Sequence, residues 1–392
     1  MKNKLFWIAT FIVFLLIYAA TSSGKTPFDY FTRLSDSFLQ GKIYLTEKPA
    51  WLTELIPAGP DKFWVVYPPM PAILAMPFRM IFKENFQQQY LAHLLGAGIV
   101  VLTMLMAWTV KRDGPLLERK KLMIWSGILA GLGNIIWFLS SVGSSWYLGQ
   151  VSAAFFLSFA LFESLTKKRS FIVGLLLGAA FLSRIHTIIS FPVFLYLLKD
   201  KKWFKNYILF GIGTLPFIIF DFVYNYLRFG VIWDKAYFIL PGILNELDKP
   251  WFIRGVANIA YIPNNLIAIF WTFPKILTIP PYIEPSWYSL AIWITTPVFV
   301  FAFFAPFKEN LVKFLWLAVI SIFLIVASHG GTGWAQFGYR FAVDFYPFLF
   351  LLVIKAVAKT GLKPIHWILL ALSVIVNLWG VIWINFFGWV SF

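Results

Sequence analysis

Long apolar segments alternate with shorter polar ones along the whole 392-residue chain. A helix that crosses the hydrocarbon core of a bilayer needs about 20 mostly apolar residues, and fewer where the helix is broken. Hydropathy and segment length predict about eleven such helices. They are expected at residues 5–21, 88–110, 122–140, 151–165, 171–182, 188–198, 207–224, 287–304, 312–328, 345–357 and 365–386. The predicted fold is therefore that of an all-α polytopic membrane protein.

Composition narrows the class further. The chain is 60% hydrophobic and 13% charged, which excludes a soluble protein with a single core. We expect one integral membrane domain over residues 1–392. Segment 5–20 also fits a cleavable signal peptide, but its apolar run is long for one, and a retained first helix is favoured. The sequence has no cysteine, which excludes disulfides and thiol chemistry.

Lysine and arginine cluster in alternate polar segments, and this sets the expected orientation. Short basic loops stay on the cytoplasmic side of a membrane. The clusters lie at 2–4, 111–121, 167–169, 199–205, 308–313 and 355–363. They place the N-terminus in the cytoplasm, as in a protein of the cytoplasmic (inner) membrane, and the C-terminus outside. The net charge of +16 is then mainly a topology signal, and no nucleic-acid partner is expected.

The longer polar segments all face outward in this topology. Three of them are long enough to carry function: a first outer loop at 22–87, a second at 225–286 and a third at 329–344. Most acidic residues lie in these loops or beside them, whereas the expected inner loops are short and basic. The active face of the protein is therefore predicted to be the outer one.

The first outer loop carries carboxylates in a helical pattern. Asp29, Arg33 and Asp36 are spaced i, i+4 and i+7, which places them on one face of a helix, and the other face is apolar. This pattern predicts an amphipathic helix at the membrane surface. The charged face is either a solvated ion pair or the place of a general base, for which one positioned carboxylate is enough.

Prolines interrupt the same loop further along. The run Tyr67-Pro68-Pro69-Met70-Pro71 is not expected to be regular helix, because each proline removes a donor and restricts the residue before it. The apolar run that follows, 72–82, is short for a span and is predicted to be interfacial or re-entrant.

Two outward arginines are candidates for binding an anion. Arg184, with His186, interrupts a pair of short apolar segments, and Arg340 precedes Asp344 in the third outer loop. An arginine at a membrane boundary needs a partner, and phosphate accepts its hydrogen bonds bidentately. Snorkelling to lipid headgroups and an Arg340–Asp344 pair are the alternatives. Several arginines on one side favour an anionic, membrane-resident substrate such as a lipid-linked phosphate.

The run that begins at His329 is rich in glycine, so its backbone can approach a ligand closely. Its spacing is not that of a nucleotide-binding loop. The four histidines lie in separate segments, which gives no support for a histidine metal site. A divalent ion held by Asp29 or Asp36 together with a lipid phosphate is left open.

Several of these motifs resemble one known family. The segments are DYFTRLSDSFLQGKIYL at 29–45, YPPMPA at 67–72, NYLRFG at 225–230, and GYRF at 338–341 followed by Asp344 and Pro347. In this order along most of the chain they resemble the bacterial GT-C membrane glycosyltransferases, which are relatives of the protein O-mannosyltransferases and the aminoarabinose lipid A transferases. The motifs are short, so the resemblance indicates the fold more specifically than the substrate.

The resemblance implies a polyprenyl-phosphate sugar as donor, an acceptor of unknown kind and inverting transfer with an acidic residue of the first outer loop as base. Asp29 and Asp36 are the candidates for the base, with Glu54 third. The Asp-Glu pair often seen in the family is missing, since Tyr30 follows Asp29. The candidates for binding the substrate are Arg340, Arg184, Arg228, His329, Glu54, Tyr67 and Tyr339.

Two other classes of protein share parts of this pattern. A transporter or flippase for a lipid-linked or anionic substrate would carry ionisable residues within its spans and a repeated half-structure. The sequence has few such residues and no evident repeat. A glycan polymerase or ligase would use the same lipid-phosphate chemistry with a different large loop. The glycosyltransferase is the preferred interpretation.

Overall fold

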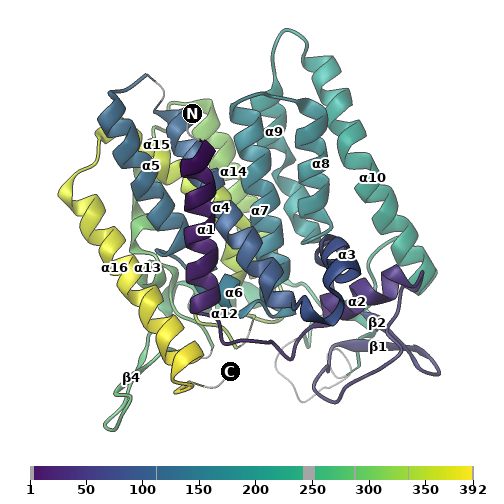
Figure 1. The fold of residues 1–392 in the computed structure, drawn as a ribbon. Coiled ribbons are helices and arrows are strands. Elements are labelled where there is room, and N and C mark those ends of the chain that lie inside the picture. Colours follow the sequence, from purple (N-terminus) through teal and green to yellow (C-terminus); the bar gives the residue numbers. More distant parts are fainter. Residues whose placement is uncertain (1–3, 112, 242–251, 287, 334, 391–392) are drawn as a thin grey trace.

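Helices make up most of the computed structural model, which describes residues 4–111, 113–241, 252–286, 288–333 and 335–390 (Figure 1). The predicted all-α membrane fold is confirmed. The α-helices are α1 (Lys4–Ala20), α2 (Tyr30–Leu39), α3 (Met70–Phe82), α4 (Gln88–Val110), α5 (Leu116–Gly131), α6 (Ile136–Val142), α7 (Ser145–Leu165), α8 (Ser170–Phe181), α9 (Phe191–Leu198), α10 (Trp203–Phe229), α11 (Ala236–Ile239), α12 (Ile262–Leu266), α13 (Ile292–Thr295), α14 (Asn310–Ala327), α15 (Tyr346–Thr360) and α16 (Pro364–Val381).

Shorter elements connect these helices. There are 3₁₀ helices η1 (Lys83–Asn85), η2 (Ile185–Ser190), η3 (Ile259–Tyr261), η5 (Pro297–Phe304) and η6 (Arg340–Phe345), and π-helical turns η4 (Ile267–Trp271) and η7 (Ile382–Phe386). Two antiparallel hairpins complete the structure, β1 (Leu55–Gly59) with β2 (Lys62–Val65), and β3 (Lys275–Ile276) with β4 (Ile283–Glu284).

The described residues include six helical segments long and apolar enough to cross a membrane: α4, α7, α10, α14, η6 with α15, and α16 with η7. The pair α5 and α6 makes a seventh if it counts as one span bent by 53°. Four further apolar helices are shorter, at Lys4–Ala20, Ser170–Phe181, Ile185–Leu198 and Ile259–Trp271. The chain is thus a multi-pass integral membrane protein, and the predicted count of about eleven spans stays a prediction.

The observed helices differ from several of the predicted segments. Segment 287–304 was expected as one span, but its described residues form the four-residue α13 and the 3₁₀ helix η5. The second of these begins at Pro297, a residue that cannot donate to a continuing helix. The helix expected at 151–165 begins earlier, because α7 starts at Ser145. The second outer loop was expected to begin at residue 225, but α10 continues to Phe229.

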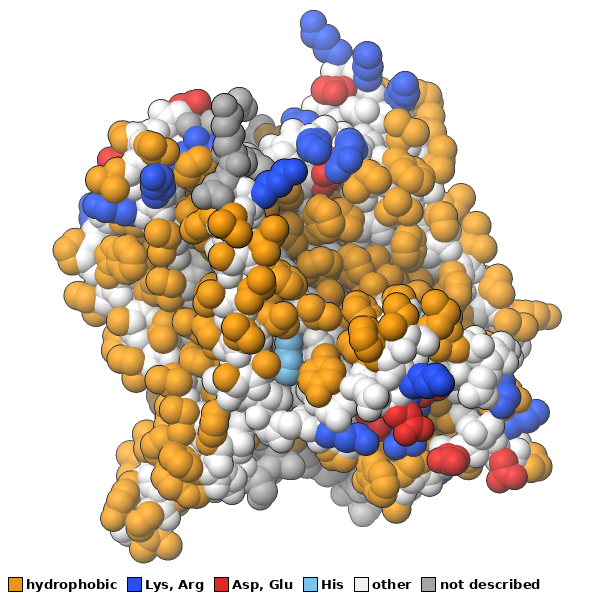
Figure 2. Space-filling model, viewed as in Figure 1, with side chains coloured by type: hydrophobic (Ala, Val, Ile, Leu, Met, Phe, Trp, Pro, Cys, Tyr) orange, Lys and Arg blue, Asp and Glu red, His pale blue; other side chains and the backbone are white. Residues whose placement is uncertain are grey.

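The helices stand side by side, and the loop elements gather at one end (Figure 1). In this view α1 begins at the upper end, and α2, α3 and the β1–β2 hairpin lie at the lower end. Hydrophobic side chains cover the visible flank (Figure 2). Lysine and arginine gather at the upper end, whereas acidic and basic side chains mix at the lower end.

Segment 22–87 folds into the amphipathic helix α2, the β1–β2 hairpin and α3. The helix was predicted, and the hairpin was not. A helix begins within the proline run, earlier than expected, since α3 starts at Met70 with Pro71 in its first turn. A proline is tolerated there because its missing N–H costs no intrahelical bond. Part of the second outer loop, residues 242–251, lies outside the described residues.

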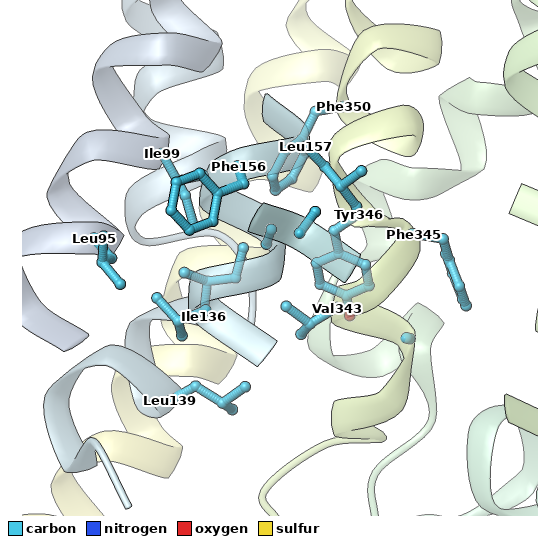
Figure 3. Packing of buried hydrophobic residues seen from close by; sticks show 14 of the residues in the cluster. Leu95, Ile99, Ile136, Leu139, Phe156, Leu157, Val343, Phe345, Tyr346 and Phe350 are labelled. Carbon is cyan, nitrogen blue, oxygen red and sulfur yellow. The ribbon is translucent and has the colours of Figure 1, made fainter. Parts of the chain in front are cut away.

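The core joins α4, α6, α7 and α15. Side chains of these helices and of η6, among them Leu95, Ile136, Leu157, Val343 and Tyr346, pack against one another (Figure 3). Close packing of this kind leaves little freedom to the backbone between the contacts. It therefore fixes η6 against α7, and these two elements carry several polar side chains described below.

Helices α8 and α10 approach each other through glycine, as closely packed membrane helices often do. A Cβ atom at Gly213 would lie 2.3 Å from the carbonyl oxygen of Phe171, whereas one at Gly211 would meet nothing within 4 Å. We expect Gly213→Ala to destabilise the protein by about 1–3 kcal/mol through overpacking. The matched variant Gly211→Ala is expected to be as stable as the wild type, because alanine favours helix. Thermal unfolding in detergent compares the two; equal melting temperatures would contradict this packing.

Candidate active site

A cavity of about 500 Å³ opens among the loop elements and helix ends. Its walls come from α2, the first loop, the start of α7, the break between α8 and η2, the α11 region, the end of α14, and η6. Polar side chains line it from elements far apart in sequence: Glu54, Tyr67, Ser145, Trp146, Ser183, Arg184, His186, Asp234, Tyr237, His329 and Arg340. Five of the residues predicted from the sequence are thus brought together, namely Glu54, Tyr67, Arg184, His329 and Arg340.

Glu54 is the carboxylate of the first loop that reaches this cavity. The Tyr67 hydroxyl donates to its Oε2, and Trp146 Nε1 donates to the same atom at 3.2 Å. The backbone N–H of Glu54 donates to the Tyr30 hydroxyl at 3.0 Å. Burial raises the pKa of Glu54, although these hydrogen bonds and the charge of Arg340 oppose the shift. A carboxylate with a raised pKa in a cavity is suited to accept a proton.

Arg340 is buried, and its guanidinium contacts a backbone carbonyl and two aromatic rings. Its Nε and Nη2 donate to the Gly333 carbonyl at 2.8 and 2.6 Å, and its guanidinium lies over the rings of Phe341 and Tyr147. Within the described part of the chain, no acidic side chain forms an ion pair with it. Gly333 has φ +107°, and a Cβ there would lie 2.6 Å from Gln336 Oε1, so only glycine brings its carbonyl to this arginine.

Arg184 shares a carboxylate with His186. Arg184 Nε donates to Asp344 Oδ2 at 3.1 Å, and His186 Nε2 lies 2.8 Å from the same oxygen. Asp344 is completely buried. The expected alternative, a pair between Arg340 and Asp344, is therefore wrong, because Asp344 faces the segment after α8. That segment is held in place by a Ser183–Ser152 hydroxyl contact of 2.9 Å.

His329 contributes a neutral ring to the cavity wall. Its imidazole packs edge-on against Tyr237, Phe252 and Phe341. Burial lowers the pKa of His329 to about 4, so the ring is uncharged at neutral pH. The glycines of this run were expected to let the backbone approach a ligand closely; Gly331 and Gly333 line the cavity, and the Gly331 N–H donates to His329 Nδ1 at 3.2 Å.

Asp29 and Asp36 lie outside this cavity. Asp29 pairs with Arg33 Nε at 2.7 Å, and Asp36 accepts from Arg79 Nε at 2.8 Å. Both line a second, smaller cavity of about 270 Å³, on the opposite side of α2 from Phe31, which lines the larger one. The structure therefore separates the two leading candidates for the base from the arginines expected to bind phosphate.

Arg228 and Tyr339 also lie outside the larger cavity. Arg228 donates to the Val65 carbonyl at 2.9 Å and to Asn225 Oδ1 at 2.7 Å, so it ties the end of α10 to the first loop. The buried Tyr339 hydroxyl donates to Asn265 Oδ1 at 2.8 Å. Both side chains are therefore hydrogen-bonded to other residues of the protein.

Sequence reasoning did not single out Asp234, Tyr237 and Trp146, which line the cavity. Burial raises the pKa of Asp234, and the Ala236 N–H donates to its Oδ1 at 2.9 Å. Their spacing in the sequence could not have identified these three residues, because only tertiary packing brings them to the cavity.

Among the described residues, no group of three or more His, Asp or Glu side chains could hold a metal ion. The divalent ion at Asp29 or Asp36 stays a hypothesis, in which a carboxylate would have to leave its arginine.

Comparison with known proteins shows similarity in structure alone. No protein-family model and no curated protein sequence matches the chain. The crystal structure of ArnT from Cupriavidus metallidurans bound to undecaprenyl phosphate superposes with a TM-score of 0.54 at 12% identity, over 94% of this chain and 62% of ArnT. The apo structure of the same enzyme gives 0.54 at 13% identity, over 93% and 62%. The chain thus spans less than two thirds of the length of ArnT, and the resemblance to GT-C enzymes is confirmed for the fold.

Proposed function

We propose that the protein is a membrane glycosyltransferase that moves a sugar from a polyprenyl-phosphate donor to an acceptor. The observation that carries the proposal is that one cavity contains both the Glu54 carboxylate and the buried Arg340, which forms no ion pair among the described residues. A buried guanidinium without a counter-ion is costly and is suited to bind an anion. The fold shared with an enzyme crystallised with undecaprenyl phosphate supports a lipid phosphate as that anion.

The cavity provides groups for each part of an inverting transfer. The donor phosphate binds Arg340 and Arg184, and the acceptor hydroxyl lies against Glu54. The acceptor oxygen attacks the anomeric carbon on the face opposite the phosphate, and its proton passes to Glu54. The bond between the anomeric carbon and the phosphate oxygen breaks, and its electron pair stays on the phosphate. The arginines stabilise the charge that develops there.

Glu54 is our candidate for the base because it is the first-loop carboxylate that lines the cavity with Arg340. The hypothesis that Asp29 or Asp36 is the base requires one of them to release its arginine and reach the acceptor from the far side of α2. It stays a prediction, and variants of all three carboxylates test it in the same assay.

The proposed location is the cytoplasmic (inner) membrane, with the N-terminus in the cytoplasm and the cavity on the outer face. The basic loops support this orientation through the preference of lysine and arginine for the cytoplasmic side. The elements that form the cavity lie at the end opposite the start of α1, as the orientation requires (Figure 1).

The test is sugar transfer by the purified full-length protein from a panel of radiolabelled polyprenyl-phosphate sugars, offered with membrane extracts as acceptor. We expect one donor to be consumed, with release of polyprenyl phosphate and inverted configuration in the product. A transporter or flippase would instead move the intact donor across vesicles without breaking it. Donor that is bound or translocated but never cleaved would reject the transferase.

A further inference from the structure

His186 lines the cavity and pairs with the buried Asp344, and the proposed transfer as described leaves this pair without a role. Asp344 Oδ2 accepts from His186 Nε2 at 2.8 Å and from Arg184 at 3.1 Å, and its side chain is fully buried. Its other oxygen, Oδ1, has no partner among the described residues. The carboxylate therefore depends on these two donors, and it fixes which nitrogen of His186 carries a hydrogen toward it.

The second nitrogen of His186 is available to a ligand. The side chain lines the cavity and is 18% exposed. Within the described residues, Nδ1 makes no hydrogen bond. Arg184 lies on the same segment, and Asp344 is the carboxylate bonded to the ring. The other charged or titratable groups that line the cavity are Glu54, Tyr67, Asp234, Tyr237, His329 and Arg340. A carboxylate that holds a histidine by one nitrogen and leaves the other to the reactants is a recurrent arrangement for proton transfer.

We propose that His186, oriented by Asp344, is the general acid for the departing lipid phosphate. This inference rests on the proposed function and adds a residue to it. The arginines supply fixed charge, whereas the imidazolium supplies a proton at the phosphate oxygen that leaves the sugar. Asp344 acts through His186 and Arg184 and is a positioning residue.

The protons balance in this scheme. As the bond between the anomeric carbon and the phosphate oxygen breaks, the electron pair stays on that oxygen, which takes the Nδ1 proton of the imidazolium. The acceptor hydroxyl gives its proton to Glu54 as it bonds to the anomeric carbon. Glu54 then returns one proton to water, and His186 regains one.

The test compares binding of undecaprenyl phosphate to the full-length protein with its turnover. We expect His186→Gln to bind this lipid roughly tenfold more weakly at pH 7, with the loss of one charge-assisted hydrogen bond. Calorimetry in buffers of different ionisation enthalpy is expected to show proton uptake on binding by the wild type and less uptake by the variant. Asp344→Asn is expected to show the same weaker binding and the same reduced proton uptake as His186→Gln. His366→Gln, the same change at a histidine outside the cavity, is expected to behave as wild type.

Each outcome decides one proposal. Equal affinity and equal proton uptake in the wild type and His186→Gln would overturn the general acid. So would an Asp344→Asn variant that binds weakly while His186→Gln binds normally, because Asp344 would then act through Arg184 alone. If the wild type binds no undecaprenyl phosphate at all, the proposed function fails instead. In the transfer assay, the rate of the wild type is expected to decline at high pH, because a general acid must carry its proton. The His186→Gln variant is expected to lack this decline.

Discussion

Glu54→Gln is expected to slow sugar transfer by about 10²–10⁴-fold, the usual effect of removing a general base. Glutamine has nearly the same shape, and its Oε1 can still accept the hydrogen bonds that Tyr67 and Trp146 donate to Glu54. The fold and the binding of the donor should therefore survive. The measurement is kcat and the dissociation constant of the donor for purified wild type and variant.

Variants of other carboxylates in the first loop provide the comparison. Glu47→Gln makes the same change at an exposed position of this loop and is expected to leave kcat unchanged. Asp29→Asn and Asp36→Asn remove partners of Arg33 and Arg79 and are expected to lower activity much less than Glu54→Gln. If either Asp variant is inactive while Glu54→Gln is active, the base is that aspartate and the assignment of Glu54 is wrong.

The pH dependence of transfer gives a second readout for Glu54. A base must be ionised, so the rate falls as the pH drops through the pKa of the base. Burial raises the pKa of Glu54 above its ordinary value, and the acidic fall in kcat/KM is therefore expected at a higher pH than for an exposed glutamate. The residual activity of Glu54→Gln should lack this fall. A rate that stays constant down to pH 4 would be inconsistent with a buried glutamate as base.

The fold was largely predictable because hydrophobic length and positive charge are local properties of the sequence. A run such as 88–110 has few alternatives in a bilayer, and α4 occupies that range. The prediction failed where a span depended on backbone detail. Segment 287–304 has the hydropathy of a helix, but Pro297 and the short α13 divide it. The β1–β2 hairpin was missed because its strands are short and flanked by charged residues.

The site was predictable in its residue types and less so in their arrangement. Arginines near the predicted outer face indicated an anionic ligand, and Arg184 and Arg340 do line one cavity. The helical spacing of Asp29 and Asp36 showed that they share a face, but it could not show that α2 turns this face away from the cavity. The contact between His186 and Asp344 joins residues 158 positions apart. No local pattern predicts a contact over such a separation.

Arg340→Gln is expected to weaken binding of undecaprenyl phosphate by roughly tenfold to a hundredfold and to lower kcat by about 10²–10³-fold. The weaker binding reflects the loss of a hydrogen bond to a charged group. The lower kcat reflects the loss of a donor to the negative charge that develops in the transition state. Scintillation proximity binding and the transfer assay measure the two. Arg254→Gln, the same change at an exposed arginine of the second outer loop, is expected to alter neither.

The stability of the Arg340→Gln variant separates a binding role from a structural one. In the absence of ligand the guanidinium is buried, and the Gly333 carbonyl is its one hydrogen-bond acceptor among the described residues. Glutamine can still donate to that oxygen. Removing an unpaired buried charge should cost little. We therefore expect the melting temperature without lipid to stay unchanged, whereas the stabilisation that undecaprenyl phosphate gives the wild type should be lost. A variant that unfolds early but keeps its lipid affinity would show that Arg340 supports the fold and does not bind phosphate.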